Sequence, residues 1–132
     1  MTNTSVIINL TNNKIINNDS NSNFLRIKKD SWGKEGENGG DVTLNLSNQS
    51  MSVNIVVDSI STLVINMKNN SYYEGALNIS NAAKKLKLNL DKISKIKLTS
   101  NLYVTSLTNE VSDNSNIDFN GYKLYVNNKS IN

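Results

Sequence analysis

The amino-acid sequence predicts an all-β fold of the β-solenoid type, with coils of about 21–23 residues. Three observations lead to this prediction. Apolar and polar residues alternate in short runs along most of the chain, and the runs repeat at an interval in the low twenties. Asparagine, which is unfavourable inside helices but suits turns, fills 26 of the 132 positions, and proline is absent. At this length we expect one domain, residues 1–132.

The alternation has a period of two residues, which places the apolar members of each run on one face of a strand. Clusters of Asn, Ser, Asp, Lys and Gly separate the runs and supply the turns between short strands. In chain order, the runs are Val6, Ile8 and Leu10; Phe24, Leu25 and Ile27; Val42, Leu44 and Leu46; Val53, Ile55 and Val57; Leu63, Ile65 and Met67; Leu77 and Ile79; Leu86, Leu88 and Leu90; Ile96 and Leu98; Leu102 and Val104; Ile117 and Phe119; and Tyr122, Leu124 and Val126.

The runs repeat with a recognisable register. A pair of apolar residues recurs as Leu44 and Leu46, then Ile65 and Met67, then Leu88 and Leu90. A serine recurs four places after the second residue of each pair, as Ser50, Ser71 and Ser94. The apolar residues of a second strand recur as Ile55 and Val57, then Leu77 and Ile79, then Ile96 and Leu98. We expect each unit to lie one rung above the preceding unit, about 4.8 Å away, with asparagines stacked in ladders at the turns.

Two alternative structures also fit parts of the sequence. A sandwich or barrel also has alternating strands, but it does not require the aligned serines. Residues 81–97 fit a helix as well, because the apolar residues Ala83, Leu86, Leu90 and Ile93 have helical spacing. The repeat favours a strand, which buries Leu88 together with Leu86 and Leu90. Residues 30–40 hold four of the six glycines and the only tryptophan, and we expect them to form a loop that protrudes between early coils.

Several segments resemble one kind of known protein. They are VVDSISTL at 56–63, NLYVTSLTNE at 101–110, and the SWG and NGG segments that follow FLRI between 24 and 40. Together they resemble the C-terminal module of secreted or surface-attached, adhesin-like bacterial proteins of the right-handed parallel β-helix kind. The resemblance implies that fold, an extracellular or cell-surface location, and a non-catalytic structural or adhesive role. It implies no catalytic residues.

The composition removes most catalytic constellations. The chain has no cysteine and no histidine, so it lacks a thiolate nucleophile, an imidazole base, the usual zinc ligands and disulfides. Its acidic residues are scattered, and Asp58 and Asp91 suit caps of turns better than calcium ligands of a polysaccharide lyase. We therefore predict no catalytic residue, no metal, no cofactor and no enzyme activity; a lyase-like enzyme is the most distant alternative.

Charge and hydropathy restrict the partners. Six lysines lie between Lys84 and Lys97, opposed only by Asp91, but no aromatic residues interleave with them for bases to stack on. We therefore expect a solvated face there and no nucleic-acid partner. No segment is apolar enough to span a bilayer, and the first residues lack the basic and apolar regions of a signal peptide.

The aromatic residues support a second functional class, a carbohydrate-binding module for cell-wall or plant-type polysaccharide. An exposed ring covers the apolar face of a sugar while nearby amides or carboxylates bind its hydroxyls. The candidate ligand-binding residues are Trp32, Tyr72, Tyr73 and Glu74. Tyr72 and Tyr73 are adjacent and point to opposite faces of a strand, so one of them belongs to the core. Trp32 either binds a ligand or closes the glycine-rich loop.

The two ends of the predicted solenoid differ. The alternating run Val6, Ile8 and Leu10 starts almost at the first residue without a capping helix, whereas Gly121, Lys123 and Lys129 guard the other end. We expect the N-terminal coil to continue a longer β-helix or to stack on another copy of the chain.

Overall fold

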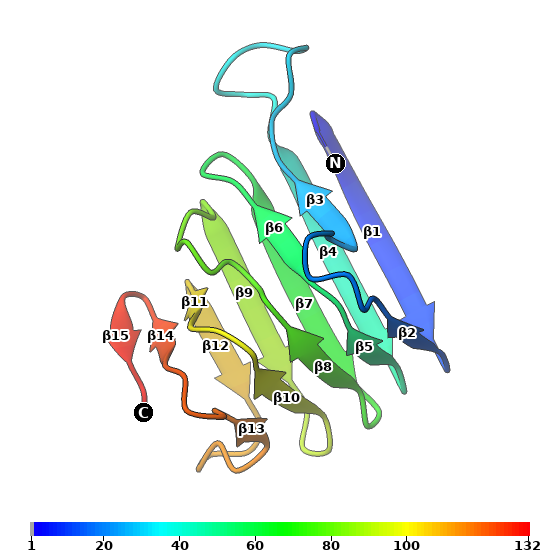
Figure 1. Ribbon diagram of the computed structural model, residues 1–132, viewed down its shortest axis with the longest axis vertical. Helices are drawn as coiled ribbons and strands as arrows, with labels where there is room; N and C mark the ends of the chain where they lie inside the picture. The colour runs from blue at the N-terminus through cyan, green and yellow to red at the C-terminus, as the bar shows by residue number, and fades with distance from the viewer. Residues whose placement is uncertain (1) are drawn as a thin grey trace.

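The computed structural model describes residues 2–132, and this part of the chain is all-β, without a helix. Nearly every strand pairs in parallel with a strand from an earlier or later stretch of sequence. Figure 1 shows long strands side by side in one tilted sheet, with a second layer of shorter strands in front of it. This confirms the all-β class, and the parallel sheets are compatible with a β-solenoid.

The strands fall into three rows. The first row is a parallel sheet of β1 (Thr4–Thr11), β4 (Gly40–Ser47), β7 (Thr62–Lys68), β9 (Lys85–Leu90) and β12 (Ser106–Asn109). The second is a parallel sheet of β2 (Lys14–Ile16), β5 (Ser50–Ser52), β8 (Tyr72–Gly75), β10 (Lys95–Leu98) and β13 (Ile117–Asp118). The third comprises β3 (Leu25–Ile27) with β6 (Ile55–Val57), and β11 (Leu102–Val104) with β14 (Leu124–Val126) and β15 (Lys129–Ser130).

Each first-row strand and the residues up to the next first-row strand are here called a coil. Paired residues of successive coils lie 36 positions apart between the first two, then 21, 23 and 19. The predicted interval of 21–23 therefore describes the middle of the chain. The first coil is longer because it contains both the turn at residues 17–24 and the loop before β4.

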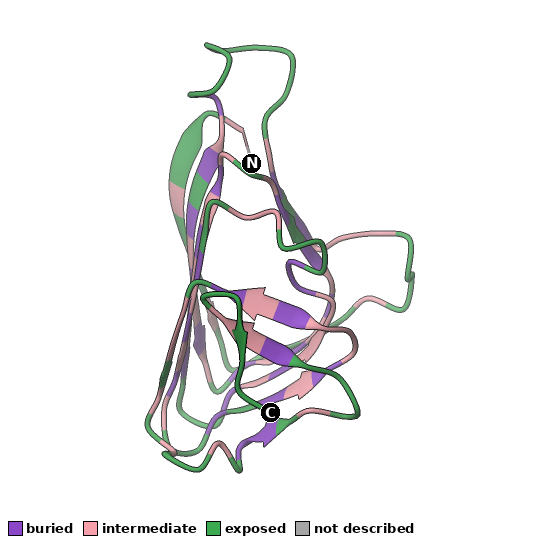
Figure 2. Ribbon diagram, turned by 90° about the vertical axis from the view of Figure 1, so that its left-hand side faces the viewer, coloured by how far each residue is buried: buried purple, intermediate pink, exposed green. Residues whose placement is uncertain are grey.

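The predicted register of the first row is confirmed. Leu44 pairs with Ile65, which pairs with Leu88, and Leu46 pairs in the same way with Met67 and Leu90. All six side chains are at most 2% exposed, and the residues between them face outward. Figure 2 shows this alternation of buried and more exposed positions along the strands. Each coil therefore buries its apolar residues on those of the next coil.

The predicted serine column is only partly correct. Ser71 and Ser94 are both buried, and the Ser71 N–H donates to the Ser94 hydroxyl over 3.1 Å. The position before them in the stack is Gln49, whose N–H donates to the Ser71 hydroxyl, whereas Ser50 pairs with Tyr72. The turn between β4 and β5 in the second coil is one residue shorter than the turn between β7 and β8 in the third coil. The shorter turn has one asparagine in the left-handed region, Asn48 (φ 48°), whereas the longer turn has two.

The second strands also differ from the prediction. Ile55 and Leu77 form a parallel bridge, as expected, but Ile96 pairs with Tyr73 and not with Leu77. Ile79 lies past the end of β8 and is 58% exposed, so it does not continue an inward face. The alternation in the sequence could not reveal that β8 stops at Gly75.

The ambiguous segment at residues 81–97 forms strands, not a helix. Leu86, Leu88 and Leu90 lie on one buried face of β9, and Ile96 lies on β10. The loop prediction is also confirmed for residues 30–39, which rise above the sheets in Figure 1, whereas Gly40 begins β4. Within residues 2–132, no helix is long and apolar enough to cross a membrane.

Candidate binding surfaces

The predicted residues Tyr72, Tyr73 and Glu74 lie on β8, in the second row. Tyr73 points inward, is 1% exposed, and donates its hydroxyl to the Val53 carbonyl over 2.9 Å. Burial raises its pKa. The expectation that one of the two tyrosines is a core residue is confirmed, and the ring of Tyr73 does not reach the surface.

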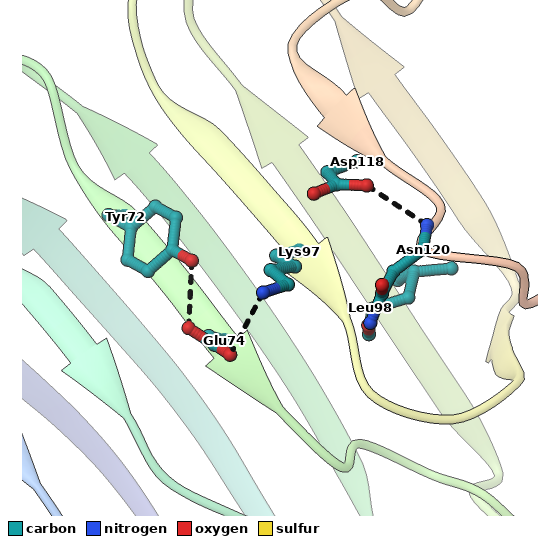
Figure 3. Close-up of polar contacts among 6 residues, drawn as sticks. All are labelled: Tyr72, Glu74, Lys97, Leu98, Asp118 and Asn120. Carbon is teal, nitrogen blue, oxygen red and sulfur yellow. Dashed lines mark hydrogen bonds and ion pairs between the residues drawn. The ribbon is translucent and has the colours of Figure 1, made fainter.

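Tyr72 and Glu74 face outward and are joined to the next coil. The Tyr72 hydroxyl donates to Glu74 Oε2 over 2.8 Å, and Glu74 Oε1 lies 3.6 Å from Lys97 Nζ (Figure 3). Partial burial, together with this hydrogen bond and the Glu74 charge, raises the pKa of Tyr72 to about 12. Three polar side chains that a ligand would need are thus engaged with one another.

The next coil continues this outer row with Asp118, which pairs in register with Lys97. Its carboxylate accepts the Asn120 N–H over 3.0 Å, and the Asn120 side chain donates to the Leu98 carbonyl (Figure 3). The charges alternate in sign along this row, and Glu74 and Lys97 form an ion pair between two coils. They do not form a group of acids that could share a metal ion.

Trp32 lies apart from Tyr72 and Glu74. It belongs to the loop between β3 and β4 and is 59% exposed, so it does not close the loop as a buried plug. Asn38 shapes this loop instead, because its side-chain amide donates to the carbonyls of Asp30 and Trp32. The structure therefore does not bring the four predicted ligand residues into one groove.

The predicted turn caps are confirmed. The Asp58 carboxylate accepts hydrogen bonds from the Lys29 N–H, the Ile60 N–H and the Ser61 hydroxyl. Burial raises the pKa of this carboxyl, but these hydrogen bonds outweigh burial and lower it from its usual value. Asp91 plays the same part in a later coil, where it accepts N–H groups from Asn69, Ile93 and Ser94. No group of three or more acids in residues 2–132 could hold a metal ion.

The six lysines between Lys84 and Lys97 do not form one strip. Lys85 and Lys87 face outward on β9 in the first row, whereas Lys95 and Lys97 face outward on β10 in the second row. The lysines therefore surround one coil, and Lys97 is engaged by Glu74.

An asparagine ladder crosses the outer face of the first sheet. Asn45 donates its side-chain amide to Asn9, Asn66 to Asn45, and Asn89 to Asn66, over 2.7–2.8 Å. Every bond runs in the same direction, from one coil to the coil before it. The side-chain oxygens of Asn9, Asn45 and Asn66 thus each accept a hydrogen bond from the next coil, which fixes the register along four coils.

A second aromatic feature escaped the sequence analysis. The rings of Tyr103 and Tyr125 stack with their centroids 4.7 Å apart and their planes at 7°. They occupy the centres of β11 and β14, whose sequences are both LYV. This repeated triplet, 22 residues apart, is the signal that could have predicted the stack.

An amide-lined hollow adjoins this stack. It has a volume of about 260 Å³ and is bordered by Tyr103, by Lys84, and by the asparagines of two turns, Asn78, Asn81, Asn127 and Asn128. Asn78 is committed to the fold, because its side chain donates to the Tyr103 carbonyl and accepts from Ala82 and Ala83. The Asn81 amide donates to Asn128 over 3.0 Å and joins the two turns.

Comparison with known proteins finds no matching family model, no matching curated protein and no matching solved structure. The resemblance to adhesin-like bacterial proteins accordingly stays a prediction.

Proposed function

We propose that this chain is a right-handed parallel β-helix that serves as a non-catalytic structural or adhesive module of a secreted or surface protein of a bacterium. The observation that carries the proposal is the uninterrupted stacking of coils. Buried apolar columns continue through the first and second sheets, and the asparagine ladder repeats the same contact on the outside. Such a stack makes a stiff, solvated rod with side faces available for contact.

The chemistry of the described surface favours this role over catalysis. The acids with lowered pKa, Asp58, Asp91 and Asp113, accept hydrogen bonds from backbone N–H groups of turns. The tyrosine with a raised pKa at the surface, Tyr72, is committed to Glu74. Perturbed groups at an active site are placed against space for a substrate, whereas these groups are occupied by hydrogen bonds within one coil or between neighbouring coils.

The surface role is tested on intact cells that make the protein. Antibodies raised against the purified chain should label the outside of unpermeabilised cells, or should detect the protein in the medium. A cytosolic protein serves as the control for lysis. Labelling that requires permeabilisation, with none in the medium, would contradict the proposed location.

A carbohydrate-binding module is the second candidate function, and the amide-lined hollow beside Tyr103 favours it. A hollow of about 260 Å³ bordered by Tyr103 and several asparagines offers hydrogen-bond partners for the hydroxyls of one sugar residue. Within residues 2–132 the side chain of Asn127 makes no hydrogen bond of its own and borders this hollow. The exposed Trp32 and the pair of Tyr72 and Glu74 offer separate, smaller contacts.

The carbohydrate role predicts binding that depends on particular rings. In a pull-down on insoluble cell-wall and plant polysaccharides, Tyr103→Ala should weaken binding at least about fivefold, because the stacking surface is lost. Asn127→Ala should also weaken it, whereas Tyr72→Phe should not. If only Trp32→Ala abolished polysaccharide binding, the binding site would lie on the loop. If none of the polymers retained the protein, the carbohydrate-binding role would be refuted and the structural role would stand.

A further inference from the structure

The coil at the N-terminal end of the stack is open on its outer side. β1 is the outermost strand of the first sheet and β2 is the outermost strand of the second. The inward side chains Val6, Ile8 and Leu10 are half-buried, whereas their partners in register, Val42, Leu44 and Leu46, are 0–2% exposed. One further layer of strand over β1 would bury the first set as fully as the second.

The opposite end is closed over the third row. β15 turns back and pairs antiparallel with β14, and the Ile131 N–H donates to the Leu124 carbonyl over 2.9 Å. The side chain of Asn132 accepts the Leu124 N–H and donates to the Tyr122 carbonyl, which fixes the returning chain. Figure 1 places this hairpin at one end of the molecule and β1 at the other. A strand added at β14 would have to displace β15, although β12 and β13 are still the last strands of the first and second sheets. Nothing described lies on the outer edge of β1.

The asparagine ladder ends at β1 with an unused donor. Asn9 accepts the amide of Asn45, but within residues 2–132 its own amide nitrogen has no acceptor, and the side chain is exposed. An amide carries both a donor and an acceptor, so an asparagine can pair with a copy of itself. The edge of β1 therefore has the self-complementary chemistry that a two-fold interface requires.

We propose that β1 is a homodimer interface, in which the edge strands of two copies pair antiparallel around a two-fold axis near Asn9. Such pairing continues the first sheet across both molecules. In this arrangement Ile8 of each copy lies opposite Leu10 of the other copy. The side-chain N–H of each Asn9 can then donate to the side-chain oxygen of the other Asn9. Because a two-fold contact uses the same edge of both copies, association through β1 stops at a dimer and does not continue as a filament.

The first test is sedimentation of the intact chain across a concentration series. The wild-type protein should pass from monomer to dimer, without larger species. Asn9→Asp should raise the dimer dissociation constant at least about tenfold, because it removes the free donor and introduces like charges at the axis. The Asp oxygen still accepts the Asn45 amide, so the melting temperature should stay near that of the wild type. Thr108→Asp, in the same row at the opposite end, is the matched control and should leave the dimer unchanged.

Cross-linking identifies the geometry. The chain contains no cysteine, so Asn9→Cys introduces a single thiol. Antiparallel partners near a two-fold axis lie about 5.5 Å apart, which a disulfide can span. Asn9→Cys should therefore oxidise to a covalent dimer much faster than Thr108→Cys does. A strict monomer, or equal oxidation of the two variants, would overturn the proposal. Preferential formation of the mixed Asn9→Cys and Thr108→Cys product would show a head-to-tail stack and overturn it as well.

Discussion

Leu88→Asp should leave the protein unfolded or with a strongly reduced melting temperature. Leu88 is fully buried on β9 between Ile65 of one coil and Leu107 of the next. A carboxylate there has no partner within the apolar column, and burying an unpaired charge costs several kcal/mol, a large part of the stability of a domain. The thermal transition measured by circular dichroism at neutral pH should report this loss.

Lys87→Asp is the matched control for this variant. Lys87 is adjacent in sequence but faces outward on the same strand, where it pairs in register with Val64 and Ser106. Reversing this charge should cost less than about 1 kcal/mol. If the two variants melt at similar temperatures, the inward and outward faces of β9 are assigned incorrectly, and with them the stacking of coils.

Gly75→Ala should be the most damaging of the conservative changes. Gly75 ends β8 with φ 150°, and an added Cβ would lie 1.8 Å from the Val53 carbonyl oxygen and 2.7 Å from its carbon. That oxygen also accepts the hydroxyl of the buried Tyr73, so it cannot retreat without breaking a buried hydrogen bond. We expect a loss of at least about 3 kcal/mol in the free energy of unfolding, or at least about 10 °C in melting temperature.

Gly121→Ala is the control for Gly75→Ala. It shows how much stability is lost when alanine adopts a positive φ without a steric clash. Gly121 also has a positive φ, 81°, but nothing lies within 4 Å of the position of an added Cβ. This variant should lose only about 1–2 kcal/mol, the cost of placing alanine in the left-handed region. Equal losses for the two variants would mean that the backbone of the third coil moves freely away from Val53. Denaturant titration at one temperature measures both values.

The stack of coils could be predicted from local patterns because each pattern has a local physical cause. Alternation with period two decides which residues of a strand share a face, and it correctly predicted that one of Tyr72 and Tyr73 belongs to the core; the structure shows that this is Tyr73. The spacing of 21 and 23 residues brought Leu44, Ile65 and Leu88 into one column. The tolerance of asparagine for the left-handed region is seen at Asn48 and Asn69, both in turns between the first two rows.

The errors arose where the length of a turn changes between coils. Two left-handed asparagines, Asn69 and Asn70, replace one in the second coil and move Ser50 out of the serine column. A shift of one residue exchanges the inward and outward faces of a strand, yet composition does not reveal which coil contains the additional residue. Ile79 was misplaced for a related reason, because the strand before it ends at Gly75.

The sequence by itself determined the all-β class, the column of Leu44, Ile65 and Leu88, and the absence of thiol and imidazole chemistry. Each of these depends on residue types or on spacing within one stretch. Only the tertiary structure decided that Trp32 lies apart from Tyr72, and that Tyr103 stacks on Tyr125 beside a hollow bordered by Asn81 and Asn128. Those residues belong to turns and strands of different coils. The distance between them depends on where each residue lies around its coil and on which coil it belongs to. Turn length and the stacking of coils set both, and no local pattern reveals them.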